Sequence, residues 1–215
     1  MIKLFYTIVV FSAFSCFNSN TQEIERAPNE QSAFDISKYD YQKIGKRCRD
    51  LYLNYSTHNS VATLNLILSQ LRDSLFVCWY GTQWDFYGTT EIPRKGKIAC
   101  GYFVTTVLRD IGIKLNRIKL AQCASEEMIK KICLQNSIKR SSNEDIRSFV
   151  RKITKAGIGL YIVGLDFHTG FILNDGKTVN FIHANYANEK VVISEQANES
   201  GVLASSKYKV IGKIL

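Results

Sequence analysis

The chain has 215 residues, of which 46% are hydrophobic, 22% charged and 12% aromatic, a composition that excludes disorder and predicts one domain with a substantial core. The net charge of +9 favours an anionic membrane surface or wall polymer as partner, although basic residues that merely solvate helix faces give the same balance. The basic residues form no arginine-rich arm and no aromatic stacking series, so we expect no nucleic-acid partner.

Residues 1–15 have the pattern of a secretory signal peptide. Lys3 precedes an apolar run over 4–14, which is shorter than the roughly 20 residues that a membrane-spanning helix needs. No later segment approaches that length, so we expect no transmembrane helix. The string AFSC resembles a loose lipobox and predicts a lipid anchor at Cys16, with simple secretion as the alternative. Residues 16–34 then form a polar tether, which indicates an exported protein, periplasmic or an outer-membrane lipoprotein of a bacterium.

The remaining residues, 35–215, are expected to form a single domain whose first half is helical. Apolar residues recur at spacings of three and four over 37–57, and again over 60–76, which predicts two amphipathic helices.

A loop and a third helix follow. Residues 78–97 are rich in glycine, threonine and aromatic residues and follow neither helical nor strand periodicity, so we expect a functional loop. We assign Trp79 and Phe86 within it to the core. The pattern becomes helical again over 98–111, and Gly112 is suited to end that helix.

The middle of the chain predicts one strand and two more helices. Residues 113–121 favour a strand, and helices are expected near 125–134 and 142–154. The SEEM string that begins at Ser125 resembles a capping box.

The last third changes to a period of two. Four short β-rich runs alternate with turns, and they read IGLYIVGLDF, TGFILND, TVNFIHANY and KVVISE. Asn174–Lys177, with the sequence NDGK, predicts a hairpin. Glu195 and Ser200 receive no functional role, and helix capping before SGVLASS explains them. Helices followed by an antiparallel sheet indicate an α+β fold.

The cysteines permit one free thiol without selecting it. They are Cys16, Cys48, Cys78, Cys100, Cys123 and Cys133. With Cys16 lipidated, five remain, so at least one is unpaired in an oxidising compartment. The other four form two disulfides in one of three ways or stay as small buried apolar residues. No cysteine or histidine spacing fits a zinc site, so we expect no metal and no cofactor.

Cys100 is the candidate nucleophile, because it lies in the first turn of the expected helix, where amides and the helix dipole lower the thiol pKa. His168 begins one strand of the expected hairpin and His183 ends its partner, so pairing brings both to one end of the sheet. His58 lies at a helix junction and is expected on the surface. These residue types alone leave a second interpretation, a buried structural cysteine with two sheet-edge histidines.

The blocks YGTQWDFYGTTE, GKIACGYFVTTVLRDIGI and FHTGFILNDGKTVNFIHA resemble the NlpC-type papain-like cell-wall peptidases. The resemblance covers about half of the chain, roughly 80–186. It implies a papain-like α+β fold with N-terminal helices packed on an antiparallel sheet. It also implies Cys100 as nucleophile, His168 as base and His183 as the residue that orients the base.

The sequence departs from the family pattern around the nucleophile. Ala99 replaces the aspartate of the family, Gly101 and Tyr102 replace its serine and glycine, and Trp84 stands where the family has a loop tyrosine. The helices expected within 125–155 resemble an insertion that narrows or covers the site.

If Cys100 attacks an amide carbonyl, the negative charge that forms on the carbonyl oxygen needs hydrogen-bond donors. We assign the backbone amide of Cys100 and a donor from Trp84 or Gln83 to this role. Asn185 lies two residues beyond His183, hence on the same strand face, and is an alternative orienting group.

The residues and the resemblance together predict a cysteine hydrolase that cleaves an amide bond, with peptidoglycan stem peptides as the expected substrate. Three alternatives remain at this stage. They are a thiol acyltransferase, a non-catalytic envelope lipoprotein that binds a wall fragment or a protein, and a component of a toxin system.

Overall fold

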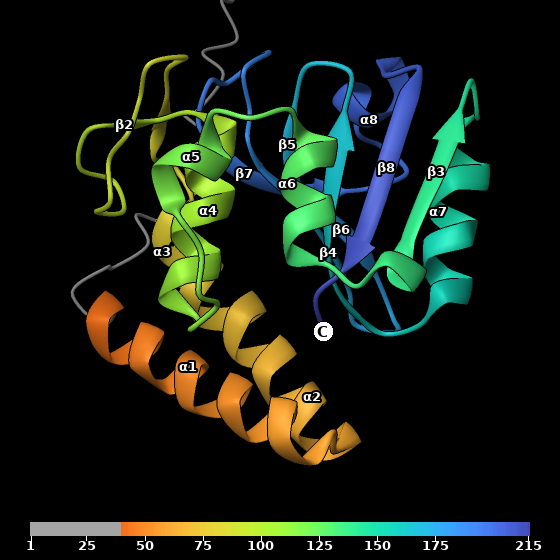
Figure 1. Cartoon of the computed structure of the whole chain (residues 1–215). Coiled ribbons are helices and arrows are strands. Elements are labelled where there is room, and N and C mark those ends of the chain that lie inside the picture. Colours follow the sequence, from red (N-terminus) through yellow and green to blue (C-terminus); the bar gives the residue numbers. More distant parts are fainter. Residues whose placement is uncertain (1–39) are drawn as a thin grey trace, which may run out of the picture. The chain divides into compact units, whose positions relative to one another are not determined.

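A computed structural model describes residues 40–215. The expected signal peptide over 1–15, the tether over 16–34 and the lipidation site Cys16 lie outside the described residues. Within 40–215 the chain folds as an α+β domain, in which helices precede an antiparallel sheet (Figure 1).

The helical elements border the sheet on both faces. They are α1 (Tyr41–His58), α2 (Val61–Gln70), the π-helical turn η2 (Leu71–Leu75), α3 (Phe76–Trp79), α4 (Cys100–Asp110), α5 (Arg117–Ala121), α6 (Ser125–Ile132), the 3₁₀ turn η3 (Gln135–Ser137), α7 (Ile146–Ala156) and α8 (Gly201–Ser205).

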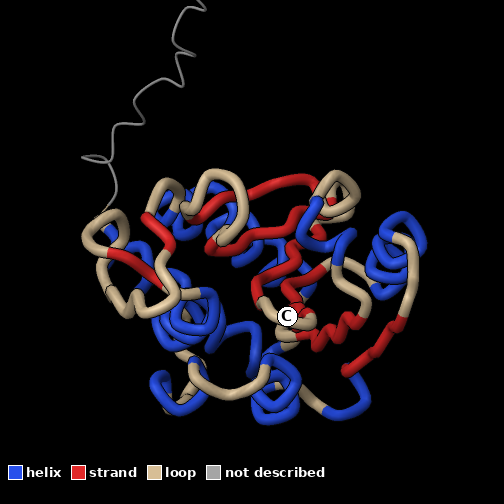
Figure 2. Tube along the Cα trace, turned by 90° about the horizontal axis from the view of Figure 1, so that it is seen from above, coloured by secondary structure: helices blue, strands red, loops and turns tan. Residues whose placement is uncertain are grey.

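Six strands form one antiparallel sheet in the order β3-β8-β4-β5-β6-β7. They are β3 (Ile138–Ser142), β4 (Gly159–Leu165), β5 (Thr169–Asn174), β6 (Val179–Ala184), β7 (Val192–Gln196) and β8 (Tyr208–Lys213). Two short strands, β1 (Gln83–Trp84) and β2 (Lys97–Ile98), pair in parallel within the loop before α4. Figure 2 shows the strands of the sheet running between the helices.

Every residue of β4 and β5 is buried, because helices cover both faces of the sheet. On β4, Leu160 and Ile162 face the larger core with the helices from α1 to α6. Tyr161 and Val163 alternate with them and face a second core under α7 and α8.

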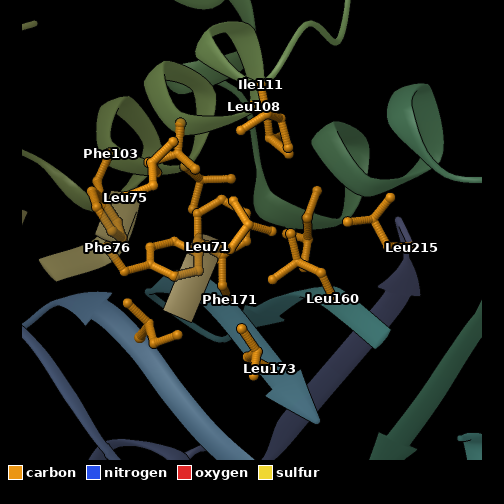
Figure 3. Packing of buried hydrophobic residues seen from close by; sticks show 14 of the residues in the cluster. Leu71, Leu75, Phe76, Phe103, Leu108, Ile111, Leu160, Phe171, Leu173 and Leu215 are labelled. Atoms are coloured by element: carbon orange, nitrogen blue, oxygen red, sulfur yellow. The ribbon is translucent and has the colours of Figure 1, made fainter. Parts of the chain in front are cut away.

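Aromatic packing in the larger core fixes α4 over β5. Phe103 of α4 lies 5.8 Å from Phe171 of β5 between ring centroids, and Phe76 of α3 lies 5.4 Å from the same ring. Figure 3 shows these side chains meeting between the helices and the sheet. Phe103 is three residues beyond Cys100 and Phe171 is two beyond Thr169, so this packing brings the start of α4 to the start of β5.

Most of the expected elements are present. The helices expected over 37–57, 60–76 and 98–111 form, and Gly112 ends α4 with φ of 101°. The NDGK hairpin joins β5 to β6, with Gly176 at φ of 86°. His58 is exposed at the end of α1, as expected.

Two expectations about the middle of the chain are wrong, and two strands of the sheet were not expected. Residues 113–121 form no strand, because the Asn116 side chain caps α5 by accepting a hydrogen bond from the Lys119 amide at 3.0 Å. Ser125 forms no capping box, since Ala124 is the N-cap of α6 and the Ser125 hydroxyl lies 3.5 Å from the Leu165 carbonyl. Strands β3 and β8 were not anticipated.

The helical stretch Val61–Trp79 is longer than the sequence suggested. Its 19 residues are apolar enough to cross a membrane on length and composition alone. Its apolar residues Leu71, Leu75 and Phe76 are fully buried in the larger core, whereas Val61 and Leu66 are exposed.

All five described cysteines are free thiols. Cys48, Cys78 and Cys133 are buried, and burial raises the pKa of their thiols, to about 12, 11 and 12 respectively. These three therefore act as small apolar core residues. Cys100 and Cys123 are partly exposed.

Candidate active site

Cys100 is the first residue of α4. Ala99 precedes it in an extended conformation, and its carbonyl accepts the first helical hydrogen bond, from the Phe103 amide at 2.9 Å. The Ala99 amide donates to the Gly88 carbonyl at 2.8 Å, which ties the start of the helix to the aromatic loop. The first backbone N–H groups of α4 have no partner within the helix, so they are available to donate hydrogen bonds near the thiol.

Gly101 allows α5 to lie against the start of α4. A Cβ atom on Gly101 would overlap the carbonyl oxygen of Ala121, the last residue of α5. No other residue type fits without moving α5. This packing gives a physical reason for a glycine at position 101.

The environment of the Cys100 thiol opposes its ionisation on balance. Burial raises the pKa of the thiol, and the amides of Thr169, Gly101 and Cys100 itself lower it, but burial prevails. The backbone amides therefore lower the thiol pKa as expected, but the net pKa of Cys100 is raised, so the expectation of a lowered thiol pKa is wrong. A base must remove the thiol proton before the sulfur can react at neutral pH.

His168 and His183 meet at the same end of the sheet, as the hairpin predicted. Nε2 of His168 lies 2.9 Å from Nδ1 of His183, and both rings are buried. Burial lowers the pKa of His168 well below its usual value, and His183 lowers it further. His168 is thus neutral at physiological pH, as a general base must be.

Glu195 on β7 extends this chain of hydrogen bonds, a contact that the sequence analysis did not anticipate. Its Oε1 lies 3.2 Å from Nε2 of His183. Burial alone would raise the pKa of Glu195, but hydrogen bonds from His183 and Ser200 lower it below its usual value. The ionised Glu195 therefore accepts a hydrogen bond from Nε2–H of His183.

The order of donors and acceptors then assigns the tautomer of each ring. Because Nε2–H of His183 donates a hydrogen bond to Glu195, Nδ1 of His183 is unprotonated and accepts a hydrogen bond from Nε2–H of His168. The Nδ1 of His168 is left without a proton. That nitrogen is the one available to take a proton from a thiol.

Gly170 makes room for the histidines. A Cβ atom at this position would lie 2.7 Å from the Phe181 ring and 2.8 Å from Cβ of His183. The Phe181 and His183 rings stack with centroids 4.0 Å apart, which fixes the orientation of the His183 ring.

Cys100 and His168 line two common pockets, of about 670 and 410 Å³. Within residues 40–215 no hydrogen bond joins the thiol to the imidazole. The two groups instead face the same hollow at the end of β5, where the Thr169 amide lies beside the sulfur. Such pairs commonly tighten only when substrate binds.

The other expected site residues divide into those at the pocket and those away from it. Trp84 lines the larger pocket beside Cys100. Its backbone amide already donates to the Lys190 carbonyl, so only its indole N–H remains as a donor for the oxyanion. Gln83 is exposed and does not line that pocket. Asn185 is buried, and its side-chain oxygen accepts a hydrogen bond from the Ala187 amide, so it shapes the turn after β6.

The aromatic loop is only partly core. Trp79 is fully buried as expected, whereas the assignment of Phe86 to the core is wrong, because its side chain is 71% exposed. Phe86 instead packs edge to face on Tyr87, and both line the larger pocket.

Arg117 of α5 holds the aromatic loop against α4. Its guanidinium donates to the carbonyls of Thr89 and Thr90 at 2.8 and 3.0 Å and to the hydroxyl of Thr106 at 2.7 Å. It also lies 4.8 Å above the centre of the Tyr102 ring.

The insertion expected within 125–155 borders the site through one helix only. Glu126 and Met128 of α6 line the smaller pocket. Phe149 of α7 packs in the core on the other face of the sheet.

Among residues 40–215, no three histidine, cysteine, aspartate or glutamate side chains are grouped as a metal site would require. A scan of the sequence against protein-family models found no match, and a search of curated proteins found no significant match.

Proposed function

We propose that the protein is an exported cysteine hydrolase with a papain-like, NlpC-type fold, which cleaves an amide bond in peptidoglycan stem peptides. The observation that carries the proposal is the placement of Cys100 at a helix start beside His168, whose ring is oriented through His183 by Glu195. The enzyme would be periplasmic, or a lipid on Cys16 would anchor it in the outer membrane. The reaction needs neither metal nor cofactor.

The reaction would begin with proton transfer from the Cys100 thiol to Nδ1 of His168. The sulfur attacks the amide carbonyl carbon, and the negative charge that develops on the oxygen accepts hydrogen bonds from the Cys100 amide and the Trp84 indole N–H. His168 then gives its proton to the nitrogen that leaves, and the C–N bond breaks. A thioester to Cys100 remains.

Water would complete the cycle. His168 takes a proton from water, the hydroxide attacks the thioester carbonyl, and the acid leaves as the thiol is restored. An amine or lipid acceptor in place of water would make the same protein an acyltransferase, because the thioester is common to both reactions.

A non-catalytic wall-binding protein is the second candidate. The raised pKa of Cys100 and the lack of a thiol–imidazole hydrogen bond within the described residues favour it. Such a protein would bind a wall fragment or a partner and would not depend on the histidines.

The test is incubation of the full chain with purified peptidoglycan and with isolated stem peptides, followed by mass spectrometry of the products. The proposal predicts new amine and carboxylate ends, and none with Cys100→Ala. Products joined to an added amine would indicate acyl transfer. Binding of peptidoglycan without any product, by both proteins alike, would overturn the hydrolase proposal in favour of the binding protein.

A further inference from the structure

A second thiol lies in the wall of the candidate site, and the reaction proposed above does not use it. Cys123 lies between α5 and α6 and lines the smaller pocket together with Cys100 and His168. Among the described residues, Cys100 and Cys123 are the partly exposed cysteines, and both are free thiols. Two nucleophilic sulfurs from different segments of the chain therefore line one pocket that solvent can enter.

The packing of α5 on α4 brings the two segments together. A Cβ atom on Gly101 would overlap the carbonyl oxygen of Ala121, so the two backbones touch at this point. Cys100 lies one residue before this contact and Cys123 lies two residues after it. A disulfide needs Cα atoms within about 7 Å of each other, which such short offsets from a backbone contact allow.

The remaining described cysteines are no competing partners. Cys48, Cys78 and Cys133 are buried in the core, with at most 7% of each residue exposed. An oxidant in solution reaches thiols according to their exposure. Cys100 and Cys123 are therefore the pair that the structure singles out for oxidation.

The surroundings of the two sulfurs indicate which one reacts first. The sulfur of Cys123 donates a hydrogen bond to the Leu120 carbonyl at 3.2 Å, so it is present as the neutral thiol. The amide of Thr169, the residue after His168, lies beside the sulfur of Cys100. Cys100 is thus the thiol whose proton His168 can take, a step that rests on the thiol–imidazole pair of the proposed function.

We propose that Cys100 and Cys123 form a disulfide when a hydroperoxide enters the smaller pocket. The Cys100 thiolate attacks one oxygen of the hydroperoxide and the O–O bond breaks, which leaves a sulfenic acid on Cys100 and releases water or an alcohol. The Cys123 sulfur then attacks the Cys100 sulfur, the S–O bond breaks, and a second water leaves with the Cys123 proton. The two thiols lose two electrons, and the hydroperoxide gains them.

The disulfide protects the nucleophile in a reversible form. A sulfenic acid that finds no thiol is oxidised further to a sulfinic acid, which thiol reductants do not restore. The disulfide stops this sequence, and a dithiol that exchanges with it regenerates both thiols. Cys123 therefore acts as the resolving cysteine for Cys100.

The first experiment looks for the disulfide itself. The full chain is reduced, freed of reductant, treated with hydrogen peroxide at pH 7 and blocked with iodoacetamide. Trypsin places the two cysteines in separate peptides, residues 98–109 and 120–130, so the disulfide joins these two peptides in the mass spectrum. We expect the joined peptides from monomeric protein, and their loss on addition of dithiothreitol. Absence of the joined peptides, or a disulfide from Cys100 to any other cysteine or to a second chain, would overturn the inference.

The second experiment measures protection. After peroxide and then dithiothreitol, the wild type should recover the iodoacetamide reactivity of Cys100, whereas Cys123→Ser should recover at least about fivefold less and carry a sulfinic acid on Cys100. Cys78→Ala removes a buried thiol outside the pocket and should recover as the wild type does. Equal recovery by Cys123→Ser and the wild type would overturn the protective role.

The same measurements separate this inference from the hydrolase proposal. Joined peptides from a chain that cleaves no amide bond would support the disulfide and count against the hydrolase. Amide cleavage by a reduced chain that forms no joined peptides would overturn the disulfide and leave the hydrolase standing. His168→Ala should form the disulfide more slowly at pH 7. An equal rate would keep the disulfide and contradict the role of His168 as its base.

Discussion

The two ends of α4 border pockets of similar size but different chemistry. At the C-terminal end a pocket of about 530 Å³ lies against α1. At the N-terminal end the larger pocket beside Cys100, which is lined by aromatic residues, has a volume of about 670 Å³. The first pocket is lined mainly by polar residues, and three of its charged side chains pair with one another. Arg109 lies 2.5 Å from Glu91 and 2.8 Å from Asp110, and Asp110 accepts a hydrogen bond from the Tyr41 hydroxyl at 2.6 Å.

A pocket is therefore a candidate site when its polar groups have no partners within the protein. At the C-terminal end the polar atoms hold α1 to α4, so their role is structural. At the N-terminal end the helix start, the Cys100 thiol and exposed aromatic rings face a pocket. His168 lies beside them, and its tautomer is set by its hydrogen bond to His183. Substitutions at the first end should change stability, and those at the second end should change chemistry.

Cys100→Ala should show the largest effect on chemistry. We expect amide hydrolysis to fall by about 10⁴-fold or more, because the substitution removes the sulfur that would attack the amide carbonyl. The thermal midpoint should change little, since the side chain is only partly buried. A large loss of thermal stability with hydrolysis retained would show that Cys100 is a core residue.

Glu195→Gln should reduce kcat by about 10- to 100-fold and leave the fold intact, because the glutamine amide oxygen still accepts a hydrogen bond from His183 but carries no charge. Loss of the Glu195 charge also removes an interaction that raises the pKa of His183, so the pH profile of kcat should change. Glu195→Asp serves as the control that keeps the charge. A change in melting temperature with kcat and its pH profile unaltered would assign Glu195 a purely structural role.

Gly101→Ala should affect both properties. The added methyl overlaps the Ala121 carbonyl, so α5 must move, at a cost of about 1–3 kcal/mol in stability. Because α5 carries Arg117 against the aromatic loop, turnover should fall as well. Gly201→Ala is a matched control, since a Cβ there meets open space. Differential scanning calorimetry together with kinetics checks both effects, and equal behaviour of the two variants would contradict the packing argument.

Tyr41→Phe should have the smallest effect on catalysis. It removes the hydroxyl that donates to Asp110 and accepts from the Trp79 indole N–H at 3.0 Å, so the buried indole and the half-buried carboxylate each lose a partner. We expect a loss of about 1–3 kcal/mol in the free energy of unfolding, measured in urea, with kcat/KM unchanged. A fall in kcat/KM with unchanged stability would break the contrast between the two ends of α4.

Local signals explain which parts of this site the sequence could predict. The start of α4 and the NDGK hairpin depend on neighbouring residues, so the positions of Cys100, His168 and His183 followed from periodicity and turn chemistry. Glu195 reaches His183 only through the register of β6 with β7, where Phe181 pairs with Glu195 and His183 with Ile193. The sequence of neither strand alone determines that register.

Long-range packing accounts for the other differences. Strand β3 has the polar sequence IKRSS and lies at the sheet edge, so no alternation of apolar residues marks it. Phe86 has the residue type of a core position, and only its place on the loop exposes it. The net pKa shift of Cys100 depends on burial by distant elements, which outweighs the local helix start.

The most direct test of the thiol–imidazole pair is the rate at which iodoacetamide alkylates Cys100, followed by mass spectrometry of its peptide from pH 5 to 10. Burial raises the pKa of the Cys100 thiol and lowers that of His168 well below its usual value, so proton transfer to neutral His168 should sustain the reaction at neutral and mildly acidic pH. The rate should fall only when His168 itself is protonated at lower pH. His168→Ala should react more slowly at pH 7 and converge with the wild type at high pH, where the thiol ionises unaided. Equal rates for the two proteins at pH 7 would contradict the pairing of Cys100 with His168.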